Sequence, residues 1–154
     1  MEAKTFTAEE LGNKETIRNL YENILNNRKY ELLDSVISPD YVGIGNLEEK
    51  GAKNFLHTVQ AVIKAFPDIQ WNILDLMADG DKVTLRWTWN GTNTRPFRGI
   101  PASNKSVTDN AIAIYQLYDR KIINAWLQSD RLGFLMQIGL IPQNLIPSPQ
   151  PKKG

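Results

Sequence analysis

Asp130 is the residue of this sequence best suited to acid–base chemistry. It stands where a strand-like run, residues 121–128, gives way to a helical pattern at 129–138. A carboxylate in a partly apolar pocket can have its pKa raised toward neutrality, and it can then remove a proton next to a carbonyl. Asp is also a favoured N-cap, so the same residue can serve merely to begin the final helix. From the residues alone the capping role is the better supported of the two.

Trp126, Gln128 and Gln116 are candidates for binding a substrate beside this aspartate. Trp126 and Gln128 share its strand parity. Gln116 joins them only if the tight turn at 119–120 carries a one-residue bulge, which places Ile114 and Gln116 on the face of Trp126. A neutral Gln can hydrogen-bond a substrate carbonyl or enolate. A simple two-residue turn instead leaves Gln116 facing solvent.

Trp87 and Trp89 alternate with polar residues in the predicted strand 82–90 and therefore share one face. The inward face is the simplest assignment, and Asn93 continues the same parity. Large aromatic side chains there can bind a flat ring, although such residues more often form plain core. Arg86 then points to the outer face, where subunits can pair.

Composition excludes several classes of function. The chain has 154 residues, a formal net charge of +1, no cysteine and one histidine. Thiol nucleophiles and cysteine-ligated metals are therefore excluded, and a histidine-rich metal site is hard to build. A near-neutral charge gives no electrostatic case for nucleic acid or an anionic membrane as a partner.

His57 lies one position off the apolar stripe of its helix, where a histidine is usually a surface or boundary residue.

The order of the predicted elements indicates an α+β domain. Helical patterns at 13–25, 30–37 and 51–65 surround a short strand at 41–44, and strands at 69–77, 82–90, 106–118 and 121–128 precede the final helix. Turns rather than helices join the later strands, which indicates an antiparallel sheet. We expect a single domain over residues 13–142. A flexible segment at 1–12 should precede it, because Gly12 limits the capping-box pattern that starts at Thr7, and a flexible proline-rich tail at 143–154 should follow it.

Several sequence motifs, in this order and spacing, resemble the SnoaL-like polyketide cyclase (ester cyclase) family, a branch of the nuclear-transport-factor-2-like fold. They are AFPD at 65–68, GDKVTLRWT at 80–88, GT at 91–92 with FRGIP at 97–101, KIINAWLQSDRLG at 121–133 and QIG at 137–139. The resemblance implies a curved antiparallel sheet wrapped around helices, with a cone-shaped pocket, no cofactor and no metal. It also implies that Asp130 acts as the general acid/base.

The chain departs from the family at two positions where other members often have histidine. Asn93 stands at one and Ile44 at the other. Asn93 can hydrogen-bond a carbonyl but cannot exchange a proton, and Ile44 can do neither. The glycine of the family's hairpin turn is Arg120 here.

Two functions remain open from the sequence. One is a cofactor-free cyclase or isomerase of a small cyclic or polyketide-like carbonyl compound, with an aspartate acid/base. The other is a non-catalytic protein of the same fold that binds an apolar or aromatic ligand between its tryptophans. In either case we expect a cytoplasmic protein without a nucleic-acid or membrane partner, and a homodimer or higher homo-oligomer.

Overall fold

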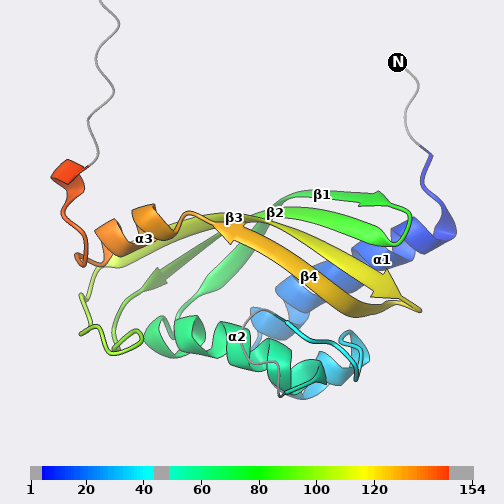
Figure 1. Cartoon of the computed structure of the whole chain (residues 1–154), viewed down its shortest axis with the longest axis horizontal. Helices are drawn as coiled ribbons and strands as arrows, with labels where there is room; N and C mark the ends of the chain where they lie inside the picture. The colour runs from blue at the N-terminus through cyan, green and yellow to red at the C-terminus, as the bar shows by residue number, and fades with distance from the viewer. Residues whose placement is uncertain (1–4, 44–48, 146–154) are drawn as a thin grey trace, which may run out of the picture.

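A computed structural model describes residues 5–43 and 49–145. A four-stranded antiparallel sheet in the order β1-β2-β3-β4 forms the larger part of the fold. Its strands are β1 (Gln70–Asp79), β2 (Lys82–Thr92), β3 (Ser106–Tyr118) and β4 (Lys121–Ser129). The sheet curves over helices α1 and α2, which lie on its inner side, and α3 continues from the end of β4 (Figure 1). The predicted α+β fold with a curved antiparallel sheet is confirmed.

The helices follow the apolar periodicity of the sequence. They are α1 (Ala8–Arg18), the π-helical segment η1 (Asn19–Leu25), the 3-10 helices η2 (Tyr30–Ser35) and η3 (Gln143–Leu145), and α2 (Gly51–Ala65) and α3 (Arg131–Gln137). Ile17, Leu20 and Ile24 present a fully buried stripe to the sheet. Pro67 follows α2 and prevents its continuation, as the sequence predicts.

The first helix begins earlier than predicted. Thr7 caps α1 by accepting a hydrogen bond from the Glu10 amide, and the Glu10 side chain accepts one from the Thr7 amide. Gly12 lies inside this helix and does not stop it. It packs against the guanidinium of Arg120, and a Cβ at Gly12 would fall 2.0 Å from the Arg120 Cζ atom. The expectation that Gly12 limits a helix here is therefore wrong, and residues 8–12 are part of α1.

The predicted strand at 41–44 is also wrong for the part that the structure describes. Residues 41–43 form no strand, and Ile37 instead makes an isolated parallel bridge to Ile122 of β4. Ile44 and residues 146–154 of the predicted tail lie outside the described residues.

The inner face of the sheet carries the core. Val83, Leu85, Trp87 and Trp89 alternate inward along β2, as predicted from their spacing. Small residues of β3 stand opposite the large ones, since Trp87 pairs with Ala111 and Leu85 pairs with Ala113. This size complementarity leaves the tryptophan rings room to project toward the helices.

Candidate functional site

A cavity of about 170 Å³ lies between the inner face of the sheet and the helices. Aromatic side chains make up much of its wall, and they come from η1, the segment before α2, α2, the first three strands, the loop after β2, and α3. The aromatic lining residues are Tyr21, Tyr41, Phe55, Trp71, Trp87, Trp89, Phe97, Tyr115 and Phe134. Such a wall suits a flat apolar ligand.

Asp109 is the one acidic residue among the described residues that line this cavity. It lies on the inner face of β3 opposite Trp89, and only 8% of its surface is exposed. Burial raises the pKa of the Asp109 carboxyl to about 6. A hydrogen bond from the Asn110 amide opposes this shift, the negative charge of Asp130 adds to it, and the positive charge of Arg131 opposes it. A carboxyl that titrates near neutrality can both accept and return a proton.

Two arginines, Arg98 and Arg131, also line the cavity. Both side chains are exposed, and the Arg98 guanidinium lies 5.7 Å from the centre of the Phe97 ring. Arg131 is the first residue of α3, directly after the last strand. The cavity therefore has apolar walls, one buried carboxylate and cationic groups where it meets solvent.

Two tyrosine hydroxyls meet inside the cavity. The Tyr21 and Tyr115 oxygens are 2.5 Å apart and hydrogen-bonded, and both residues are buried. Trp87 lies beside them, and its indole Nε1–H has no hydrogen-bond partner among the described residues. The cavity thus holds polar donors opposite the apolar surfaces.

The structure places Asp130 at the N-terminus of α3. Its Oδ1 accepts a hydrogen bond of 2.9 Å from the Gly133 amide, so it is the N-cap that the residue pattern favoured. Asp130 is exposed and does not line the aromatic cavity. It borders a shallow depression on the outer face of the sheet, together with Arg86 and Gln128. The acid/base role implied by the family resemblance stays a prediction.

Gln116, Trp126 and Gln128 share one face, but it is the outer one. The predicted bulge exists, because the β3–β4 register shifts between Gln116 and Leu117, and Ile114 pairs with Trp126. The face was assigned wrongly: the alanines opposite Trp87 and Leu85 put the odd positions of β3 inside, and the even positions therefore point outward. Gln116 donates a hydrogen bond to Asp81, and 45% of Trp126 is exposed.

Trp87 and Trp89 line the cavity as predicted, whereas Asn93 does not. Asn93 is buried, its Oδ1 accepts from the Ser103 amide, and its Nδ2 donates to the Arg95 carbonyl. The bond to Ser103 spans the loop between β2 and β3, and the bond to Arg95 lies within the start of this loop. Asn93 therefore holds the loop that brings Phe97 and Arg98 to the cavity.

Sequence reasoning missed Asp109. The signal was present, since Asp109 shares its strand parity with Val107, Ala111, Ala113 and Tyr115, and a carboxylate within an apolar stripe is unusual. His57 is exposed on α2, where it contacts Glu49 and does not line the cavity.

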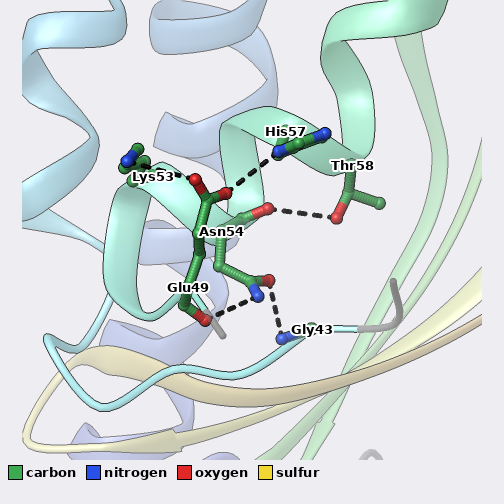
Figure 2. Close-up of polar contacts among 6 residues, drawn as sticks. All are labelled: Gly43, Glu49, Lys53, Asn54, His57 and Thr58. Carbon is green, nitrogen blue, oxygen red and sulfur yellow. Dashed lines mark hydrogen bonds and ion pairs between the residues drawn. The ribbon is translucent and has the colours of Figure 1, made fainter. Parts of the chain in front are cut away.

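Asn54 of α2 ties together two chain segments next to the cavity (Figure 2). Its Oδ1 accepts a hydrogen bond of 2.8 Å from the Gly43 amide, and its Nδ2 donates one of 2.8 Å to the Glu49 carbonyl. Glu49 in turn pairs with Lys53 and His57, which lowers the pKa of its carboxyl. These contacts fix the entry to α2, whose Phe55 and Thr58 line the cavity.

Within residues 5–43 and 49–145, no three side chains of the His, Asp or Glu type gather closely enough to hold a metal ion. No helix of the described part of the chain has the length and apolar character needed to span a membrane.

The family model for SnoaL-like polyketide cyclases matches residues 15–138. The chain belongs to the SnoaL-like polyketide cyclase family. Solved structures agree with this assignment. TsrD from Streptomyces laurentii is 25% identical with a TM-score of 0.74, and the match covers 90% of this chain and 100% of TsrD. IdmH from Streptomyces antibioticus is 27% identical with a TM-score of 0.72, and the match covers 82% and 98%.

A SnoaL-like protein from Jannaschia sp. CCS1 shares the fold at 19% identity, with a TM-score of 0.80 and coverage of 91% and 100%. No curated protein matches the sequence.

Proposed function

We propose that this SnoaL-like protein is a cofactor-free cyclase or isomerase of a small cyclic or polyketide-like carbonyl compound, with Asp109 as the acid/base. The observation that carries the proposal is a carboxylate with a pKa raised to about 6 in the wall of an aromatic cavity. Such a group is ionised at neutral pH and still basic enough to take a proton from a carbon next to a carbonyl.

An isomerisation needs only proton transfer, and a cyclisation needs in addition the formation of a carbon–carbon bond. Asp109 removes the α-proton, and the C–H electron pair moves into the carbonyl to give an enolate. In an isomerase, Asp109 returns the proton to a different carbon. In a cyclase, the enolate carbon attacks a second carbonyl of the same molecule, and the new alkoxide takes up a proton. Apolar walls that exclude water favour both paths, because a reactive enolate is then not reprotonated by solvent.

Deuterium exchange tests the proposal without knowledge of the natural substrate. The bicyclic ketone 2-tetralone in D₂O takes up deuterium at its α-carbons when the proton that Asp109 has removed exchanges with D₂O before it is returned to the enolate, and NMR follows the exchange. We expect the protein to accelerate it with a lower pH limb near 6, and Asp109→Asn to lose roughly 10²- to 10⁴-fold of the acceleration.

Asp130→Asn is the matched variant, because Asn caps a helix about as well as Asp. It should keep most of the exchange activity. Loss in Asp130→Asn with full activity in Asp109→Asn would instead support the role implied by the family resemblance.

A non-catalytic binding protein is the second candidate. It is favoured by the exposed position of His57, which leaves the described cavity lining without a histidine. Binding of 2-tetralone with no exchange above the buffer rate would select this function.

The outer face of the sheet supports a homodimer. Two rows of paired residues there carry five exposed apolar side chains, here called the apolar band: Leu74, Met77, Ile112, Ile114 and Trp126. The same rows also contain Thr84, Gln128 and the Asp75–Arg86 ion pair. Polar rows flank the band, with Thr88 and Asn110 on one side and Lys82 and Gln116 on the other. A second copy of the same face, turned by a two-fold axis, would bury band against band.

A further inference from the structure

The side chains of Tyr21, Tyr115 and Trp87 have more donor protons than hydrogen bonds within the described structure. The three side chains bring three polar protons: two hydroxyl protons and one indole proton. The contact between the Tyr21 and Tyr115 oxygens uses one hydroxyl proton. One hydroxyl proton and the indole proton are left over, in residues of which at most 5% is exposed.

Either hydroxyl can be the donor in the contact between Tyr21 and Tyr115. Burial raises the pKa of both hydroxyls. The Trp87 indole lies near Tyr21, where it opposes this rise in the pKa of the Tyr21 hydroxyl, although it forms no hydrogen bond of normal geometry. An indole N–H can only donate, so a Tyr21 oxygen that accepts from both neighbours leaves its own proton free to point into the cavity.

We infer that Tyr21 donates its own proton into the cavity and binds the oxygen of a planar carbonyl, enolate or phenol ligand. Donors aimed at the Tyr21 oxygen polarise its O–H bond and make it a stronger donor. An enolate oxygen gains more from such a donor than a ketone oxygen does, because the negative charge develops there. The inference deepens the proposed function, since it assigns the group that holds the carbonyl while Asp109 transfers the proton.

A pair of small probes tests the donor directly. 4-Nitrophenol carries an oxygen that can accept this hydrogen bond, and 4-nitrotoluene has nearly the same shape without that oxygen. Quenching of tryptophan fluorescence gives the dissociation constant of each, because Trp71, Trp87 and Trp89 line the cavity. For Tyr21→Phe we expect 4-nitrophenol to bind roughly 3- to 10-fold more weakly and 4-nitrotoluene to bind as before.

Tyr30→Phe is the matched control. The Tyr30 hydroxyl is likewise buried with no hydrogen-bond partner in the described structure, but it does not line the cavity. Both probes should bind to Tyr30→Phe as they do to the unchanged protein. Circular dichroism checks that all variants fold.

Two results overturn the inference. One is an unchanged preference for 4-nitrophenol over 4-nitrotoluene in Tyr21→Phe. The other is loss of the preference in Tyr115→Phe but not in Tyr21→Phe, which would make Tyr115 the donor. The probes report binding only, so a protein that shows the preference but no deuterium exchange retains this inference and loses the proposed function.

Discussion

The carboxylate of Asp109 lies among aromatic rings, where its charged form is less stable than in water. Its pKa is about 6 in the folded protein against an ordinary value of 3.8, so the folded state binds more protons than the unfolded state between these values. The stabilising contribution of protonated Asp109 is therefore complete below a pH of about 4, and it is lost as the pH rises through about 6.

Asp109→Asn cannot ionise and should remove this pH dependence. We expect the variant to match the unchanged protein near a pH of about 4 and to be more stable by on the order of 1–2 kcal/mol near pH 7, allowing for partial solvent contact. Urea unfolding at a series of pH values measures the difference. Asp40→Asn alters an exposed carboxylate outside the cavity and should show no comparable trend. A difference that is constant with pH would contradict the assignment of the raised pKa to Asp109.

At the scale of single elements, two hydrogen bonds of Asn54 hold the segments on either side of it next to the cavity. Asn54→Ala leaves the Gly43 amide and the Glu49 carbonyl without this partner. We expect the free energy of unfolding to fall by about 2–3 kcal/mol. Asn27→Ala removes an exposed side chain with a single 3.3 Å bond, and it should change the stability by less than about 0.5 kcal/mol. Equal effects of the two variants would show that the Asn54 bonds are unimportant.

Sequence periodicity predicted the elements well and their orientation less well. The bounds of β3 and α2 follow directly from alternation and from Pro67. The bulged turn correctly predicted that Ile114 and Gln116 share the face of Trp126, but this face is the outer one, because the inner positions of β3 must be small opposite the large side chains of β2. Which side of a strand is buried depends on its neighbours, and a single strand does not contain that information.

The candidate site was predicted in part for the same reason. Trp87 and Trp89 were found because Val83, Leu85, Trp87 and Trp89 alternate with polar residues along their strand. Tyr21 and Tyr115 were missed, because their meeting depends on how η1 packs against β3, and the two residues are 94 positions apart in the chain. Contacts between elements so far apart in sequence leave no local pattern.

At the scale of the whole molecule, the apolar band on the outer face predicts the state of assembly. We expect the protein to be a dimer in solution and Trp126→Lys to be a monomer, because a lysine within the apolar band would be buried in the interface without a partner. Light scattering after size-exclusion chromatography measures the mass. Leu11→Lys changes an exposed apolar residue of α1, outside the band, and should remain dimeric. A monomeric unchanged protein would exclude this interface.

Along β3, side chains alternate between the cavity side and the outer side of the sheet, so one strand serves two roles that can evolve separately. Odd positions such as Asp109 and Tyr115 face the ligand cavity, and even positions such as Ile112 and Ile114 face outward. Substitutions at odd positions can therefore alter ligand preference without touching the outer surface, and those at even positions can alter assembly without touching the ligand. Among homologues, we expect odd positions to covary with the inward residues of β2 and even positions to drift independently of them. A lineage can in this way acquire a new substrate while its quaternary structure is inherited unchanged.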